Sequence, residues 1–157
     1  MYGGTWRELI LKEFIEKYWN SVYMVYKGKL INMLEIRHVM VRNTEGAIIG
    51  LLCYYQERNC FHVVSMNAVE PNKGIGSALI EQLYMLAVKE GISHLQVETT
   101  NDNVVAIGFY QKMGFDIIAI RLNEVENQRL LKPEIPLIGY HNIPIRHIIQ
   151  FRKNVGI

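Results

Sequence analysis

The sequence changes from a strand-like to a helical pattern at residues 73–79, Lys-Gly-Ile-Gly-Ser-Ala-Leu. Glycines at a helix start leave the backbone N–H groups open to an approaching anion. A helix N-terminus also presents unpaired donors and the positive end of the helix dipole. The pattern is equally typical of a plain tight turn. Read as a functional site, it predicts a seat for phosphate or pyrophosphate on the backbone of Lys73, Gly74, Ile75, Gly76 and Ser77.

Three strand-like runs precede this segment, at residues 35–42, 47–56 and 60–69. Polar turn residues separate them at 43–46, where Gly46 supplies a positive φ, and at 57–59. Short gaps of this kind connect antiparallel neighbours. The runs therefore predict an antiparallel meander that leads directly into the glycine segment.

The residues after the glycines predict a helix over 75–90, which ends at Gly91. Its apolar face is formed by Leu79, Leu83, Leu86 and Ala87. Residues 94–100 then read as a strand. A strand, a helix and a strand in this spacing predict a right-handed crossover between parallel strands.

The remaining chain alternates in the same way. We expect a helix at 103–113, capped by Asp102 or Asn103 and closed by Gly114, and a strand at 115–122. A polar helix at 123–132 and a final strand at 145–153 follow. Gly108 lies inside the first of these helices at a cost of about 1 kcal/mol relative to Ala, and it would allow a cofactor or a strand to approach closely.

The N-terminal region predicts a helix at 5–19, followed by a short strand at 22–26. Thr5 and Glu8 have the spacing of a capping box. The expected apolar stripe consists of Trp6, Leu9, Ile10, Phe14 and Tyr18. Taken together, the elements predict an α+β fold in which helices cover both faces of a mixed sheet.

Composition narrows the class of protein further. The chain has 157 residues, of which 50% are apolar and 20% charged, and this predicts one domain over residues 1–157. A net charge of +2 does not favour nucleic acid as a partner. No apolar run is long enough to cross a membrane, and no signal peptide is evident, so the expected location is cytoplasmic.

The metal-binding and redox residues are few. Cys53 and Cys60 are expected to be buried, reduced thiols. The histidines are scattered without paired spacing, so we expect no metal site.

A second motif, residues 101–115, completes the pattern. It reads Asn-Asp-Asn-Val-Val-Ala-Ile-Gly-Phe-Tyr-Gln-Lys-Met-Gly-Phe. With the glycine segment before it, this stretch resembles the GNAT superfamily of acyl-CoA-dependent N-acetyltransferases. The matching positions are Gly74, Gly76, Asn103, Ala106, Tyr110, Gly114 and Phe115. The resemblance is good over roughly residues 35–123.

The resemblance implies a GNAT-like three-layer fold, with about six to seven strands and a V-shaped splay between the fourth and fifth. It implies acetyl-CoA as cosubstrate, with its pyrophosphate at the glycines. The pantetheine would lie along the end of the fourth strand, on the backbone of Asn67, Ala68 and Val69. One of those N–H groups would polarise the thioester carbonyl.

The resemblance also assigns roles to individual side chains. Tyr110 corresponds to the general acid for the leaving thiolate, although it could instead be an aromatic residue on the helix surface, with Phe109 as the better core residue. Asn103 corresponds to a cofactor contact and is equally a helix cap. Glu98, or Glu70, is a candidate general base. Each carboxylate is more commonly a structural or solvated charge, in which case water could relay the proton.

The predicted acceptor is a primary amine on a small molecule or peptide, and family analogy alone allows a homodimer. One departure is Pro71, where the family usually has Arg or Gln. Its presence keeps an alternative open, namely a non-catalytic sensor or scaffold that binds acyl-CoA on the same fold.

Overall fold

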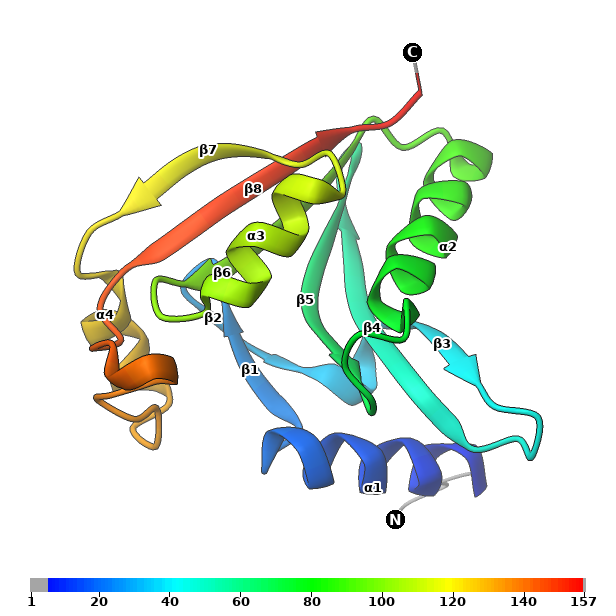
Figure 1. Ribbon diagram of the computed structural model, residues 1–157, viewed down its shortest axis with the longest axis horizontal. Helices are drawn as coiled ribbons and strands as arrows, with labels where there is room; N and C mark the ends of the chain where they lie inside the picture. Colours follow the sequence, from blue (N-terminus) through cyan, green and yellow to red (C-terminus); the bar gives the residue numbers. More distant parts are fainter. Residues whose placement is uncertain (1–5, 157) are drawn as a thin grey trace.

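A computed structural model describes residues 6–156, which form an α+β fold with two sheets (Figure 1). Most predicted elements are present within one to three residues of their expected bounds. The helices are α1 (Trp6–Trp19), α2 (Ile75–Glu90), α3 (Val104–Lys112) and α4 (Glu124–Leu131), with short 3-10 helices at Met33–Glu35 and Tyr140–Asn142. The strands are β1 (Tyr23–Tyr26), β2 (Lys29–Asn32), β3 (Arg37–Arg42), β4 (Ile48–Glu57), β5 (Cys60–Ala68), β6 (His94–Thr100), β7 (Asp116–Arg121) and β8 (Ile148–Asn154).

The main sheet has six strands in the order β3-β4-β5-β6-β8-β7. The predicted meander forms β3 to β5, and α2 connects β5 to the parallel strand β6. The final strand, β8, lies between β6 and β7 and runs antiparallel to both. The prediction of a mixed sheet is therefore confirmed.

A second, two-stranded sheet consists of β1 and β2, joined by a tight turn at Lys27 and Gly28. The sequence predicts β1 but not β2. That strand is only four residues long and half of it is exposed, so its hydrophobic pattern is weak.

The parallel strands β5 and β6 pair only at their beginnings, from Cys60 opposite His94 to Val63 opposite Val97. Beyond these pairs β5 continues to Ala68 and β6 to Thr100 without further pairing between them. The two strands diverge in Figure 1. Because β2 was not predicted, β5 and β6 are the predicted fourth and fifth strands, and their divergence is the expected V-shaped splay.

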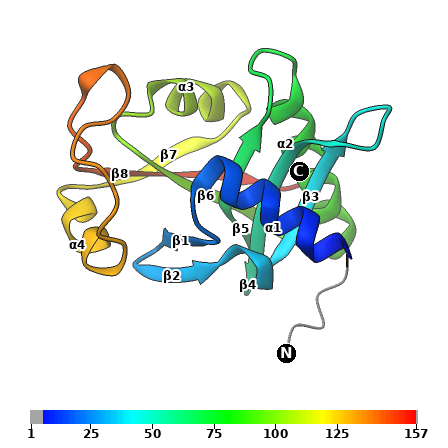
Figure 2. The same cartoon turned by 90° about the horizontal axis from the view of Figure 1, so that it is seen from below.

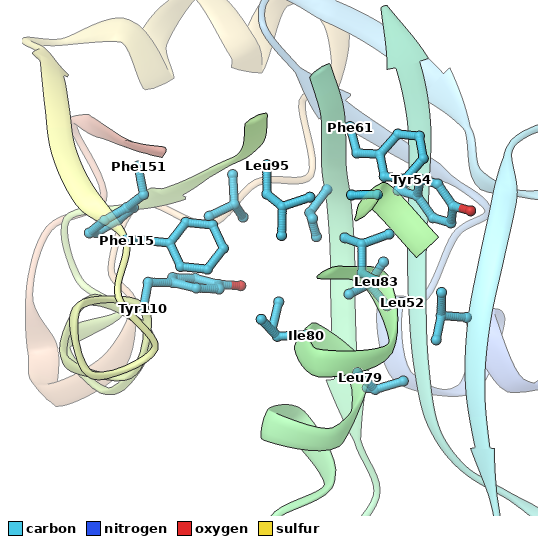
Figure 3. Close-up of a cluster of buried hydrophobic side chains, with 14 of the residues drawn as sticks. Leu52, Tyr54, Phe61, Leu79, Ile80, Leu83, Leu95, Tyr110, Phe115 and Phe151 are labelled. Carbon is cyan, nitrogen blue, oxygen red and sulfur yellow. The ribbon is translucent and has the colours of Figure 1, made fainter. Parts of the chain in front are cut away.

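Helices α2 and α3 cover one face of the sheet, whereas α1 and the β1–β2 sheet lie on the other (Figure 2). The predicted face of α2 is correct: Leu79, Leu83 and Ala87 are buried, and Leu86 packs against their cluster. Gly91 closes α2 with a φ of 73°. Figure 3 shows the cluster that α2, α3 and the sheet share.

The predicted stripe of α1 is wrong at its N-terminal end. Trp6 and Leu9 are 78% and 55% exposed, whereas Leu11 and Ile15 are buried against the β1–β2 side of the sheet. The buried face follows where the sheet lies rather than the largest side chains. The predicted capping residue Thr5 lies outside the described residues.

Both cysteines are free thiols, but only Cys53 is buried as expected, because Cys60 begins β5 at the edge of the core and is half-buried. Burial raises the pKa of Cys53 to about 11. Gly108 does not admit a neighbouring strand, because no described atom outside its own helix's backbone and its chain neighbours lies within 4 Å of the position that a Cβ would occupy.

Two glycines provide a matched test of this packing. A Cβ on Gly50 in β4 would collide with Ile75 of α2, so Gly50→Ala should lower the free energy of unfolding by about 1–3 kcal/mol. Gly108→Ala meets open space inside a helix and should raise it by up to about 1 kcal/mol. Urea unfolding of both variants measures the difference. Equal effects would contradict the described seating of α2 on β4.

Candidate functional site

The start of α2 presents the unpaired amides that the glycine motif predicts. Gly74 adopts the left-handed conformation, with φ of 74°, and no side chain caps the helix. The amide of Ala78 donates to the Gly74 carbonyl at 3.0 Å and begins the intrahelical ladder. The N–H groups of Ile75, Gly76 and Ser77 precede that bond and therefore have no partner within the helix.

These amides border a cavity of about 680 Å³ that passes through the splay between β5 and β6. One half is lined by the start of α2, the end of β5 and α3. The other half is lined by β1, α4 and the segment before β8. Of the predicted cofactor residues, Ala68, Gly74, Ile75, Gly76, Ser77 and Asn103 line the cavity, whereas Lys73 is exposed outside it and Asn67 and Val69 are not part of the lining.

Of the three amides predicted to face the cavity at the end of β5, only that of Ala68 does so. Val69 donates its N–H to the Ile49 carbonyl at 2.8 Å, on the β4 side. Because backbone groups alternate along a strand, Asn67 also faces β4, whereas the N–H of Ala68 faces the open edge. The Asn67 side chain has a buried Nδ2 without a hydrogen-bond partner in residues 6–156.

Tyr110 lies on α3 with its ring in an aromatic cluster. The ring centroids of Phe115 and Phe151 are each 5.5 Å from its own, and only 6% of the residue is exposed. The expectation that Phe109 is the core residue is wrong. Tyr110 faces β8, whereas Phe109 is half-buried and lies against the position of Gly76.

The Tyr110 hydroxyl points away from Phe151 and toward Ile80 of α2 (Figure 3). It has no hydrogen-bond partner within the described residues, although Tyr110 lines the cavity. Burial raises the pKa of Tyr110 above its ordinary value. The phenol therefore keeps its proton throughout the physiological range and can donate it or a hydrogen bond.

Asn103 caps α3, since its side chain accepts a hydrogen bond from the Ala106 amide at 3.2 Å. Of the two residues predicted as the cap, Asp102 and Asn103, the structure therefore has Asn103. The same residue lines the cavity at the mouth between α2 and α3. Its cap role fixes the side chain at the position where a cofactor contact is expected.

Glu98 lies on the face of β6 that is turned toward the β1–β2 sheet, and it also lines the cavity. Its Oε2 accepts from Arg121 at 2.6 Å, and its Oε1 accepts from the Lys27 amide at 2.9 Å. The side chain is only 5% exposed. These contacts hold one carboxylate firmly at the narrow end of the splay. Glu70, the other candidate, is exposed at the rim.

One part of the site had no sequence signal. The β6–α3 turn fixes the segment before β8, because Asp102 accepts from the Tyr140 amide at 3.1 Å and Asn101 accepts from the Arg146 and His147 amides at 2.8 Å. Gly139 leaves room for the Asp102 carboxylate. These contacts join residues about forty positions apart, which local patterns cannot pair.

Comparison with known proteins identifies the class that this fold and cavity define. The model of the acetyltransferase (GNAT) family matches residues 5–115. The uncharacterized protein YxbD of Bacillus subtilis (strain 168) is 36% identical over 146 residues, which cover 93% of this chain and 92% of YxbD. The chain therefore belongs to the acetyltransferase (GNAT) family.

Two solved structures share the fold. The IAA acetyltransferase from Bacillus cereus ATCC 14579 has a TM-score of 0.66 and 25% identity, covering 75% of this chain and 77% of that one. A GNAT family acetyltransferase from Elizabethkingia anophelis with acetyl-CoA bound has a TM-score of 0.67 and 22% identity, covering 99% and 95%.

The sequence predicts neither a membrane span nor a metal site. No helix within residues 6–156 is both long and apolar enough to span a bilayer. In the same residues, no group of three or more His, Cys, Asp or Glu side chains is gathered as metal ligands would be.

The wall of the cavity formed by β1 is joined to β5 by a hydrogen bond of 2.9 Å between Tyr26 Oη and His62 Nδ1. His62 is buried, and burial lowers its pKa from 6.5 to about 4. The folded state thus favours the neutral ring, whereas the unfolded chain takes up a proton below pH 6.5.

The stability that this residue contributes is complete above pH 6.5 and declines as the pH falls to about 4. The added slope is at most about 1.4 kcal/mol per pH unit. Urea unfolding across this range should give a shallower loss of stability for His62→Phe than for the wild type. Identical slopes for the two proteins would contradict the buried neutral state.

Proposed function

We propose that the protein is an N-acetyltransferase that moves an acetyl group from acetyl-CoA to a primary amine of a small molecule or peptide. The observation that carries this proposal is the single cavity through the splay. It brings the open amides of α2, the free edge of β5 and the Tyr110 hydroxyl into one space. The family and the fold shared with an acetyl-CoA complex support the same assignment.

In this proposal the cofactor pyrophosphate binds the amides of Ile75, Gly76 and Ser77 at the positive end of α2. Pro71 offers no side-chain donor at the rim, so the main chain carries this contact. Lys73 adds positive charge outside the cavity, and Asn103 contacts the cofactor from α3. The pantetheine follows the open edge of β5 as an added strand.

The reaction requires an electrophile, an amine and a proton donor. The Ala68 amide donates to the thioester oxygen and stabilises the negative charge that forms when the amine attacks. The bond from carbon to sulfur then breaks, and the protonated Tyr110 phenol donates to the departing thiolate. The amine must lose a proton before or during the attack.

Glu98 is the candidate that receives or relays this proton. Its charge at the narrow end of the splay also attracts the ammonium form of the acceptor. Both of its oxygens already accept hydrogen bonds from the protein, which favours positioning of the amine with water as the relay. The acceptor enters from the half of the cavity lined by β1 and α4.

Two glycines at opposite ends of α2 test the cofactor seat. Gly74 and Gly91 have φ values of 74° and 73°, and at each a Cβ would meet open space. Both Ala variants should lose about 1 kcal/mol of stability from the left-handed backbone. Only Gly74→Ala should weaken CoA binding, by roughly tenfold. Isothermal titration calorimetry measures the affinities, and equal CoA affinity in the two variants would remove the anion seat from α2.

The hydroxyl of Tyr110 tests the chemistry. Tyr110→Phe should lower kcat by about 10²-fold. It should leave stability and CoA affinity unchanged, because the hydroxyl has no protein partner in the described residues. Tyr54→Phe removes a hydroxyl from the same buried cluster, outside the cavity lining, and should keep full activity. Unaltered turnover in Tyr110→Phe rules out the acid role, and CoA binding without turnover of any amine favours the sensor.

A further inference from the structure

The edge of β1 that faces away from β2 carries two polar anchors. Tyr26 pairs with Lys29 across the turn, and Tyr23 pairs with Asn32. Because backbone groups alternate in direction along a strand, the Tyr23 carbonyl and the Lys27 amide point away from β2, toward the opposite edge of β1. The Tyr23 carbonyl accepts from Lys132 Nζ at 2.9 Å, and the Lys27 amide donates to Glu98 at 2.9 Å.

These two anchors set a fixed spacing along the cavity. Strands rise about 3.3 Å per residue, so the Tyr23 carbonyl and the Lys27 amide are roughly 10 Å apart. The cavity lining between them includes Met24 and Val25, and Ile135 and Ile145 line the acceptor half from the segment before β8. A charge of each sign therefore stands at opposite ends of a largely apolar channel.

Lys132 is the one Lys, Arg or His side chain among the described residues that line this cavity. No carboxylate in residues 6–156 lies within 4 Å of its Nζ. An ammonium has three donors, and the Tyr23 carbonyl takes one. The side chain is half-buried, and burial lowers its pKa while the charge of Glu134 partly offsets that effect. A half-buried cation with no carboxylate within 4 Å favours an anionic ligand.

Glu98 supplies the opposite end. Each of its oxygens accepts one hydrogen bond, and a carboxylate oxygen can accept a second. In the function proposed above, the reactive amine lies beside it at the narrow end of the splay. The amine end and the cation end of the channel are therefore distinct.

We propose, on the basis of that function, that the acceptor carries a carboxylate roughly 10 Å from its reactive amine and that Lys132 binds this carboxylate. An ω-amino acid with an apolar chain has this chemistry. The two termini of a short extended peptide have it as well, since three residues span about 10 Å. Lys132 is thus the residue that determines acceptor specificity.

Binding to the CoA-saturated protein tests the assignment without turnover. Isothermal titration calorimetry compares 8-aminooctanoate with octylamine, and triglycine with triglycine amide. Within at least one pair, the member with a carboxylate should bind at least tenfold more tightly than the member that lacks it. The pair that shows the larger preference identifies the source, either an ω-amino acid or a peptide terminus.

Substitutions then assign the preference to Lys132. Lys132→Met should abolish it, Lys132→Arg should retain most of it, and Lys12→Met on the exposed side of α1 should leave it unchanged. A lysine that only ties α4 to β1 would, when replaced, weaken both members of a pair equally. Melting temperatures of all variants identify any that fail to fold.

Three results have separate meanings. Absence of a carboxylate preference in the wild type, or a preference that survives in Lys132→Met, overturns the acceptor assignment and leaves acetyl transfer standing. A preference lost only in Lys132→Met supports the assignment. If that preference is found but no amine is acetylated from acetyl-CoA, the assignment stands as a ligand site and the proposed enzyme activity is contradicted.

Discussion

The structure depends on the separation of β5 from β6 after only four residue pairs. A strand edge left without a neighbour has backbone donors and acceptors that must find partners. Here the edge is not covered by another strand. It borders a cavity, so the free N–H of Ala68 is directed into the space that a ligand would occupy. The break in the sheet is therefore the feature that creates the site.

The elements around this break hold it open from both sides of the sheet. On one side, α2 and α3 pack on the strands through the cluster in Figure 3, and they contribute the helix start and Tyr110. On the other side, the β1–β2 sheet is joined to β5 through Tyr26 and His62. Glu98 and Lys132 then connect β1 to β6 and α4. The two halves of the cavity thus belong to different layers.

Local sequence patterns were sufficient for the elements with strong periodicity. The apolar face of α2, its two glycine ends and the meander before it follow from residue spacing alone. The glycine segment also begins α2, and Tyr110 lies on α3, as the helices predicted from the sequence require. These features depend on residues that are near neighbours in the chain, which is why local sequence patterns predict them.

The rest depended on contacts between distant residues. Tyr110 rather than Phe109 is buried because β8, the last strand, lies beside β6 and brings Phe151 to α3. Of the three predicted amides only that of Ala68 faces the open edge, because its neighbour Val69 bonds to β4. Lys132 is held at the cavity by a hydrogen bond to the Tyr23 carbonyl, which lies 109 positions away in the sequence. No local spacing indicates such pairings.

The most direct measurement is residue-by-residue amide hydrogen exchange by NMR, with and without CoA. If the coenzyme follows the open edge of β5 and the start of α2, the amides of Ala68, Ile75, Gly76 and Ser77 become protected when CoA binds, while Val69, already bonded to Ile49, changes little. Protection at another surface, with these four amides exchanging as in the free protein, would contradict the site.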